Sequence, residues 1–245
     1  MSIANIKLSG RTPLLRDDLG CGLGGGGGLS GDDGPTHHGL FDISYLRCIP
    51  NMVHLDASNE DELADMLFTA LHHDGPIAIR YPRGNGPGVA LKAKPQLMAI
   101  GKAEVVKHGT QVAILGLGAL LPMALEVAKE LEARGFSTAV INPRSVKPLD
   151  GDTISFFARS ADVVVTMEDH VLAGGFGSAV LEELANRGLQ TPVVRIGWPD
   201  GFIEHGKPDA LRLKYGLSVP ATVEKTLPYL KKSAATAKTA AKVVA

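Results

Sequence analysis

The first half of the chain contains one stretch in which hydrophobic and polar positions follow a clear pattern. Short apolar runs at 52–55 and 77–81 are typical of buried strands. Between these runs, one apolar face repeats at helical spacing, formed by Leu63, Met66, Leu67, Ala70 and Leu71. Ser58, with Asp61 three residues later, predicts the start of this helix, and Gly75-Pro76 predicts its end. The pattern therefore predicts a strand, helix, strand unit.

The second half is more regular, because short apolar runs alternate with helical patterns along its whole length. Strands are predicted at 112–115, 138–141, 162–166 and 192–196, and helices at 121–134, 152–159 and 177–187. Short apolar strands that alternate with helices are typical of a parallel sheet covered on both faces. The pattern predicts an α/β fold.

The composition divides the chain into four parts. Residues 1–28 show no periodicity and end in five consecutive glycines, so we expect a flexible leader. Residues 83–100 are rich in Gly, Pro and Lys, which is typical of a linker, and we place a domain boundary near residue 95. The expected domains cover 29–95 and 96–232. Residues 233–245 form an Ala- and Lys-rich tail.

Charge and hydropathy exclude several classes of protein. The 25 Lys and Arg residues are balanced by 26 Asp and Glu, which argues against a nucleic-acid binder that depends on many phosphate contacts. No run of about 18 apolar residues is present, so we expect no membrane span. Two cysteines, Cys21 and Cys48, form neither a disulfide framework nor a metal motif, and we expect a reducing, cytoplasmic environment.

The densest group of polar residues lies at 31–39, ahead of the first strand. Asp32, Asp33, His37 and His38 stand there among turn-forming residues. An imidazole can donate or accept a proton near neutral pH, and a neighbouring carboxylate can orient a hydroxyl group. The cluster is a candidate catalytic loop, and a solvated polar loop is the alternative. We predict no metal site, because adjacent His37 and His38 point to opposite sides of an extended chain and no second ligand cluster follows.

Two further segments follow predicted strands. Arg80 and Arg83 lie at the carboxyl end of the 77–81 strand, where open parallel sheets bind ligands, and an arginine fork suits a phosphate or carboxylate. A surface ion pair is the alternative. Glu168 to His170 precede a glycine-rich turn in which Ser178 is a candidate helix cap. That turn lacks the spacing of a dinucleotide site, so a helix-packing or subunit-contact loop is the better interpretation. His205 is interpreted as a loop residue that packs locally.

Five longer motifs resemble one known family. They read SGDDGPTHHGLFDISYLRCIPNM, DGPIAIRYPRGNGPGV, VINPRSVKPLD, EDHVLAGGFGSAV and IGWPDGFIEHG. From about Leu29 to Lys232 the chain resembles the C-terminal third of the 1-deoxy-D-xylulose-5-phosphate synthases, which are thiamine-diphosphate enzymes of the transketolase superfamily. The resemblance implies a truncated pyrimidine-binding-type α/β domain, followed by a transketolase C-terminal-type α/β domain with a mainly parallel sheet.

The resemblance also implies an activity. The family decarboxylates pyruvate on thiamine diphosphate, with Mg2+, and joins the two-carbon unit to D-glyceraldehyde 3-phosphate. The product, 1-deoxy-D-xylulose 5-phosphate, is a precursor of isoprenoids and thiamine. Asp33 and His37 match the family's catalytic Asp and His. Arg80 matches the arginine that grips the acceptor's phosphate, and Arg83 is the second candidate for that role. The second domain implies a homodimer and offers no catalytic residue.

The chain also departs from the family pattern. It has no Gly-Asp-Gly to Asn motif for the diphosphate and magnesium, and residues 1–28 match neither the activating glutamate nor the Asp-Arg-Ala-Gly segment of the family. Thus the resemblance identifies no cofactor-binding residue, and the first sheet should have an uncovered edge. We expect the chain alone to be inactive. Two alternatives are the small subunit of a two-chain thiamine enzyme of 2-oxoacid dehydrogenase type, and a non-catalytic dimerisation or binding module.

Overall fold

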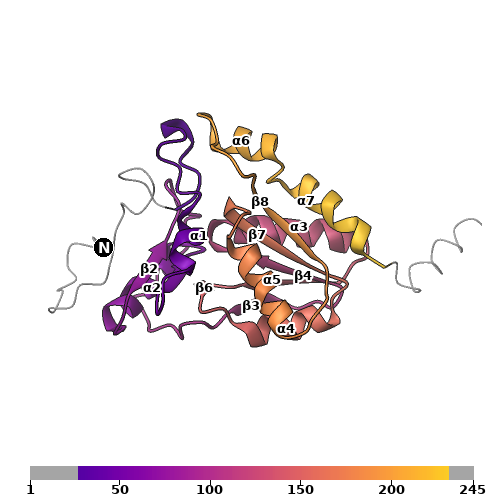
Figure 1. Cartoon of the computed structure of the whole chain (residues 1–245), viewed down its shortest axis with the longest axis horizontal. Helices are drawn as coiled ribbons and strands as arrows, with labels where there is room; N and C mark the ends of the chain where they lie inside the picture. The colour runs from indigo at the N-terminus through magenta and orange to yellow at the C-terminus, as the bar shows by residue number, and fades with distance from the viewer. Residues whose placement is uncertain (1–26, 232–245) are drawn as a thin grey trace, which may run out of the picture.

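The computed structural model describes residues 27–231 and contains two β-sheets that lie side by side (Figure 1). The smaller sheet has three strands and the larger has five, and helices pack on both. The α/β class expected from the sequence is confirmed. The leader, up to residue 26, and the tail at 233–245 lie outside the described residues.

The first part of the chain forms the smaller sheet and its helices. Its elements are η2 (Gly31–Asp33), α1 (Asp42–Arg47), β1 (Val53–Asp56), α2 (Glu60–His72) and β2 (Ile77–Arg80). β1 and β2 are parallel, with Val53 opposite Ile77 and Asp56 opposite Arg80. The predicted strand, helix, strand unit is confirmed. Because the two strands end together, Asp56 and Arg80 meet at the carboxyl edge of the sheet.

The start of α2 differs from the prediction by one residue. Asn59, not Ser58, is the N-cap, and its side chain accepts a hydrogen bond from the Glu62 backbone N–H at 2.9 Å. Ser58 instead donates its backbone N–H and its hydroxyl to Glu62 Oε2, at 2.7 and 2.6 Å. Both residues can cap a helix, and Glu62 takes the place that Asp61 had in the predicted capping box.

The larger sheet has the strand order β3-β5-β4-β7-β8. Its strands are β3 (Glu104–Lys107), β4 (Val112–Gly116), β5 (Thr138–Asn142), β7 (Val163–Val171) and β8 (Val193–Trp198). All neighbours are parallel except β3, which runs antiparallel to β5 at the edge. The four strands predicted in this half are confirmed. β3 was missed because its residues alternate between exposed and half-buried, so the segment lacks an apolar run.

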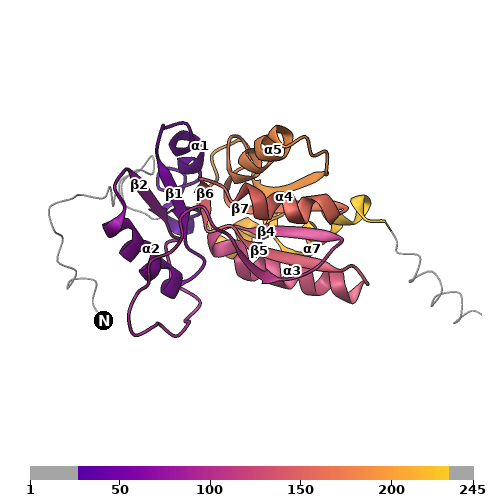
Figure 2. The ribbon, with the colours of Figure 1, turned by 90° about the horizontal axis from the view of Figure 1, so that it is seen from below.

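Helices cover both faces of the larger sheet (Figure 2). They are η3 (Gly118–Leu120), α3 (Leu121–Ala133), α4 (Gly151–Ser160), α5 (Phe176–Asn186), α6 (Pro208–Tyr215), α7 (Val219–Thr226) and η4 (Leu227–Tyr229). α3 and α7 pack in one core cluster with the fully buried Trp198, whereas α4 and α5 pack in a second cluster around Phe176. The prediction of a parallel sheet covered on both faces is therefore confirmed.

The two halves of the chain share the smaller sheet. β6 (Ser145–Lys147) comes from the second half and pairs antiparallel with β1, giving the order β2-β1-β6. The edge of β1 that faces away from β2 is therefore paired with β6, and β2 is an edge strand of the described sheet. Between β2 and β3 the described chain has no helix or strand, as expected for a linker. The boundary near residue 95 falls within this segment.

Candidate functional site

The loop with the Asp and His cluster is closed at its base and held against the second domain. Gly28 and Gly39 exchange backbone hydrogen bonds at 2.7 and 2.9 Å, which brings the ends of the loop together. At its far side, η2 packs on α6, and a Cβ atom at Gly31 would lie 2.9 Å from Pro208. Gly34 has φ +74° and ψ −168°, a conformation that favours glycine. The loop therefore lies between the two domains.

His38 anchors this loop rather than facing the solvent. Its side chain is buried, its Nδ1 accepts the Ser30 backbone N–H at 3.1 Å, and its Nε2 lies 3.4 Å from the Glu204 carbonyl oxygen. Because Nδ1 accepts a hydrogen bond from Ser30, it carries no hydrogen itself. The ring hydrogen is therefore on Nε2, which donates to the Glu204 carbonyl oxygen, and the ring is neutral. Burial lowers the pKa of His38, which favours the same neutral form.

Asp33 and His37 are half-buried and therefore more accessible than His38, whereas Asp32 is exposed. Asp33 forms an ion pair with Arg83, whose side chain is 52% exposed. The hydroxyl of Thr36 lies 2.9 Å from His37 Nδ1, which orients the ring and leaves Nε2 as the nitrogen that can reach a ligand. The structure therefore brings Asp33 and Arg83 together, although 50 positions separate them in the sequence.

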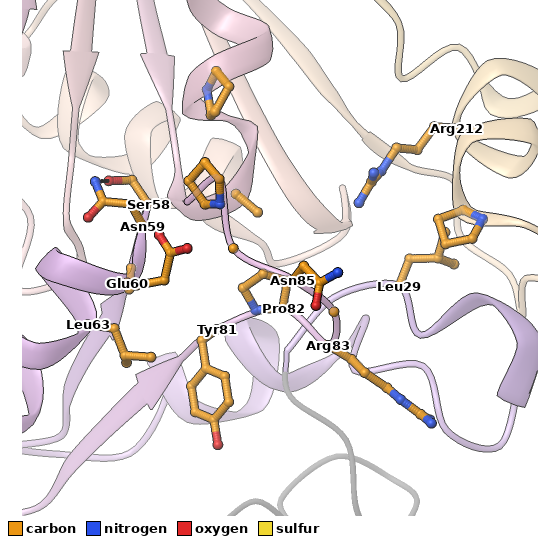
Figure 3. Close-up of a pocket in the computed structure, with 17 residues that line it drawn as sticks. Leu29, Ser58, Asn59, Glu60, Leu63, Tyr81, Pro82, Arg83, Asn85 and Arg212 are labelled. Carbon is orange, nitrogen blue, oxygen red and sulfur yellow. Dashed lines mark hydrogen bonds between the residues drawn. The ribbon is translucent and has the colours of Figure 1, made fainter. Parts of the chain in front are cut away.

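A cleft of about 440 Å³ opens between the two domains beside this ion pair (Figure 3). Its residues are Leu29, Ala57, Ser58, Asn59, Glu60, Leu63, Tyr81, Pro82, Arg83, Gly84, Asn85, Gly86, Pro87, Ala119, Pro122, Pro208 and Arg212. Arg83 extends from the loop after β2, whereas Arg212 approaches from α6. Glu60 lies on the other side of the view. The cleft thus has arginines on one side and a carboxylate on the other.

Arg80 lies behind the cleft in a buried network of charged groups. Its Nε donates to Asp42 and its Nη1 to Asp56, both at 2.9 Å. Its Nη2 donates to the carbonyl oxygens of Gly39, at 2.9 Å, and Asp169, at 2.5 Å. These four bonds join α1, β1, the closed loop and β7. The Arg80 side chain is only 4% exposed and its donors are engaged in these four bonds, whereas the Arg83 side chain is 52% exposed.

Burial shifts the pKa values of the groups around Arg80. Burial raises the pKa of Asp56 to about 7, although the charge of Arg80 opposes this shift. Burial by itself would also raise the pKa of Asp42, but the charge of Arg80 and its hydrogen bond lower it below its usual value. Burial lowers the pKa values of His54 and His170 to about 4, so both rings are neutral at pH 7. Arg80 therefore holds the positive charge of this cluster.

The glycine-rich turn after β7 contains its own anion. Glu168 accepts the backbone N–H groups of Phe176 and Gly177, at 2.5 and 2.8 Å, at the start of α5. A carboxylate therefore occupies the position where a helix could bind a phosphate. Burial raises the pKa of Glu168 to about 7. Ser178 is not the helix cap that was predicted, because it lies inside α5 and donates to the Leu172 carbonyl oxygen at 3.0 Å.

The sequence analysis missed Asp42, Asp56 and Arg212, and it did not connect Asp169 with Arg80. The three acidic residues meet Arg80 from three different elements, and no local spacing indicates that they meet. Arg212 was missed together with its helix. The signal for that helix was present, because Pro208 is its first residue and Gly216 adopts the left-handed conformation just after its end.

No group of three or more His, Cys, Asp or Glu side chains within residues 27–231 is arranged to hold a metal ion. In the same part of the chain, every helix is too short or too polar to cross a lipid bilayer.

Two known domain families match the chain. The transketolase pyrimidine binding domain matches residues 16–88, and the transketolase C-terminal domain matches residues 101–221. The first match begins inside the segment that we expected to be an unmatched leader. Together the two matches follow the domain order that the motifs implied.

The most similar sequences include 1-deoxy-D-xylulose-5-phosphate synthases from two bacteria. The chain is 63% identical to the synthase of Methylacidiphilum infernorum over 205 residues, which is 84% of this chain and 32% of the relative. It is 64% identical to the synthase of Acidobacterium capsulatum over 208 residues, covering 85% of this chain and 33% of the relative. The chain therefore spans about a third of the length of these curated relatives.

Solved structures give the same fold. A protein described as "Split gene transketolase, inactive beta4 tetramer" matches with a TM-score of 0.70 and 32% identity, covering 80% of this chain and 63% of that chain. A transketolase from Pichia stipitis matches with a TM-score of 0.61 at 15% identity, covering 81% of this chain and 28% of that chain, a likeness that shows the fold alone.

Proposed function

Since this chain belongs to the transketolase superfamily and matches the C-terminal third of 1-deoxy-D-xylulose-5-phosphate synthases, we propose that it forms the acceptor-binding part of such a synthase. The whole enzyme would convert pyruvate and D-glyceraldehyde 3-phosphate to 1-deoxy-D-xylulose 5-phosphate and CO2. The observation that carries this proposal is the contact of Asp33 with Arg83 beside the cleft between the two domains. A catalytic loop and a phosphate-binding cation meet there.

Each of these residues has a role in the proposal. Arg83 binds the phosphate of the acceptor, since its side chain is half exposed and lines the cleft. His37 Nε2 bonds a hydroxyl or carbonyl oxygen of the substrate and assists proton transfer. Asp33 orients Arg83 and the substrate's hydroxyl group. Arg80 positions the loop, because its bonds to Gly39 and Asp169 join that loop to the second domain.

The complete family enzyme is proposed to use thiamine diphosphate and Mg2+. The thiamine diphosphate would supply the carbanion chemistry. The described residues do not fit the diphosphate and its metal ion. The backbone N–H groups at the start of α5 are occupied by Glu168, and no cluster of metal ligands is present within residues 27–231. We therefore assign no cofactor-binding residue, and derive no step through the cofactor from these residues.

A two-chain enzyme is the second candidate. A protein described as a split gene transketolase is 32% identical to this chain, and it is described as inactive as a beta4 tetramer. By analogy, this chain would be inactive alone and would gain activity with a partner chain that supplies the cofactor site. A purely structural dimerisation module has less support, because such a module needs no accessible Asp33, His37 and Arg83.

The assembly and location also belong to the proposal. We assign a homodimer that forms through the second domain, where α4 and α5 expose the large apolar side chains of Phe156 and Leu181. Analytical ultracentrifugation of the chain tests this assignment. The cytoplasm is the proposed location, which agrees with Cys48 being a free, exposed thiol.

The test of function is a reconstitution. The purified chain is mixed with pyruvate, D-glyceraldehyde 3-phosphate, thiamine diphosphate and Mg2+, and CO2 release is measured. We expect no turnover until the N-terminal two thirds of the Methylacidiphilum infernorum synthase is added as a separate polypeptide. His37→Ala should then lower the rate by about 10²- to 10⁴-fold, whereas His108→Ala, on an exposed position of the second domain, should not.

Two outcomes of this reconstitution would contradict the proposal. Robust turnover by the chain alone would show that it contains a complete site. If the two parts form a stable complex that remains inactive with the wild-type chain, then the chain does not supply the acceptor side of this reaction.

A further inference from the structure

Arg212 projects from the second domain into the cleft. It lies in α6, four residues after Pro208, and residues at this spacing share one face of a helix. Both residues line the cleft. Figure 3 shows the Arg212 side chain approaching from α6, with its guanidinium directed toward the interior of the view. The second domain, which the family resemblance left without a site residue, therefore contributes a cation to this cleft.

The hydrogen-bonding capacity of Arg212 is largely unused. Its Nη2 lies 3.4 Å from Asp169 Oδ2, and its Nη1 lies 3.8 Å from Asp209, whose side chain is fully exposed. Its Nε is buried and has no hydrogen-bond partner among the described residues. A buried donor that is left unpaired costs free energy, and a guanidinium offers five donors in a planar fork. The geometry thus leaves donors for a ligand.

Asp169 does not neutralise Arg212 by itself. Its Oδ1 accepts the indole N–H of Trp198 at 2.6 Å, and its Oδ2 also accepts the Leu29 backbone N–H at 3.3 Å. The carboxylate is therefore shared among several donors, and its distance to Arg212 is long for a charge-assisted bond. This arrangement holds the guanidinium in place while its charge remains available.

The other charges of the cleft fit an anion at the same end. Arg83 lies on the wall formed by the loop after β2, and its partner Asp33 is a partly exposed carboxylate. Exposed ion pairs contribute little free energy, so a phosphate can compete for Arg83. Glu60 lies at the other side of the cleft and already accepts the Gly88 backbone N–H at 2.8 Å. Arg83 and Arg212 both line the cleft, and Figure 3 shows the Arg83 guanidinium directed away from Arg212, so Arg83 must leave Asp33 and turn to meet a phosphate beside Arg212.

We propose that Arg212 and Arg83 form a two-arginine clamp for the phosphate of the ligand, with one arginine from each domain. The identity of the ligand as D-glyceraldehyde 3-phosphate rests on the function proposed above, whereas the anion site itself does not. The clamp makes α6 a specificity element. The packing of η2 on α6 brings the loop that contains Asp33 against the helix that contains Arg212.

The test measures binding by the full chain with isothermal titration calorimetry. The titrants are inorganic phosphate, D-glyceraldehyde 3-phosphate and D-glyceraldehyde. We expect Arg212→Ala to weaken both phosphate-containing ligands by about tenfold or more, since a hydrogen bond to a charged group is lost. Arg212→Lys should retain part of the affinity, because it keeps the charge but loses the fork. Arg159→Ala removes an exposed arginine from α4, at the other end of the molecule, and should change nothing.

The outcomes separate this proposal from the proposed function. If His37→Ala weakens D-glyceraldehyde 3-phosphate but not inorganic phosphate, and Arg212→Ala changes neither, the clamp is wrong and the function stands. If phosphate binding depends on Arg212 but D-glyceraldehyde 3-phosphate binds no better than phosphate, the clamp stands and the function is wrong. Absence of phosphate binding to the wild-type chain overturns the clamp, whereas the reconstitution still decides the proposed function. Circular dichroism checks that each variant is folded.

Discussion

Arg80 and Asp56 face each other at the ends of two neighbouring parallel strands, with Nη1 and Oδ2 2.9 Å apart. Both side chains are buried, and Asp42 accepts a second bond from the same guanidinium. The pair lies directly behind the loop at 31–39, because Arg80 also donates to the Gly39 carbonyl oxygen. A charged core of this kind depends on both partners, because a lone buried charge is costly.

Arg80→Met should destabilise the fold strongly. It leaves the Asp42 and Asp56 carboxylates buried without their cation, and removal of one partner of a buried pair typically costs about 3–5 kcal/mol. Urea denaturation measures the free energy of unfolding, with Arg159→Met on an exposed position as the control. Unchanged stability in Arg80→Met, together with loss of phosphate binding, would restore Arg80 as the phosphate ligand.

The buried histidines should make stability depend on pH. Burial lowers the pKa of His170 to about 4. The hydrogen bonds of the ring fit its neutral form, because Nδ1–H donates to the Val171 carbonyl oxygen at 2.7 Å and Nε2 accepts the Ser44 N–H at 3.4 Å. The unfolded state binds a proton below about pH 6.5, but the folded state binds it only near pH 4. The contribution of His170 is therefore present above pH 6.5 and is lost as the pH falls toward 4.

His170→Asn should reduce this dependence. The amide keeps a donor for Val171 but cannot ionise, so the difference in unfolding free energy between pH 7 and pH 5 should shift by about 2 kcal/mol relative to the wild type. Asp56 and Glu168 affect the pH dependence of the unfolding free energy in the opposite direction. Burial raises their pKa values to about 7, so their contributions to stability are lost as the pH rises. The effect of His170 must therefore be measured by comparing variants. An unchanged pH difference, equal to that of His108→Asn, would refute the prediction.

The regular elements could be predicted because their patterns are local. Most strands of the larger sheet are short apolar runs, and the apolar residues of α3 and α5 repeat at helical spacing. The spacing of apolar residues within each segment therefore identifies both the type of element and its buried face. β6 could not be predicted in this way. It is three residues long and pairs with β1, far away in the sequence, so nothing near Ser145 indicates its partner. Its pairing depends on how the two domains dock.

The candidate site was predictable only in part, for the same reason. Asp33 and His37 stand in one short motif, and Arg80 and Arg83 in another, so their chemistry could be noticed from the sequence. Which arginine is buried depends on Asp42, Asp56 and Asp169, which meet only in the folded chain. The position of Arg212 depends in turn on the packing of α6 against η2.

The linker should be released by a single substitution in α2. Asp65 accepts the Gln96 backbone N–H at 2.7 Å and pairs with Lys92 at 2.7 Å, and Thr69 accepts the Met98 N–H at 2.8 Å. Asp65→Ala removes the central bond of this series, so the segment around Lys92 should open more often. Trypsin should cut the Lys92-Ala93 bond several-fold faster, whereas the Lys94-Pro95 bond is not a trypsin site. Glu130→Ala, on an exposed face of α3, is the control, and equal cleavage rates would contradict this role of Asp65.

Gly34→Ala tests whether the loop conformation matters for binding as well as for stability. Gly34 has φ +74° and ψ −168°, and a Cβ atom there would lie 2.2 Å from His205 Nε2. The backbone strain alone should cost about 1–3 kcal/mol. Gly188→Ala is the matched control, because its φ is +67° but no atom lies within 4 Å of the new Cβ position. Adding His205→Ala to Gly34→Ala should recover only the part of the lost stability that is due to the contact with His205.

The same substitution should also affect ligand binding. Since Gly34 follows Asp33 directly, Gly34→Ala should weaken the binding of D-glyceraldehyde 3-phosphate, as measured by calorimetry, whereas Gly188→Ala should leave it unchanged. Equal effects of the two variants on binding would mean that the loop conformation does not position Asp33 for the ligand.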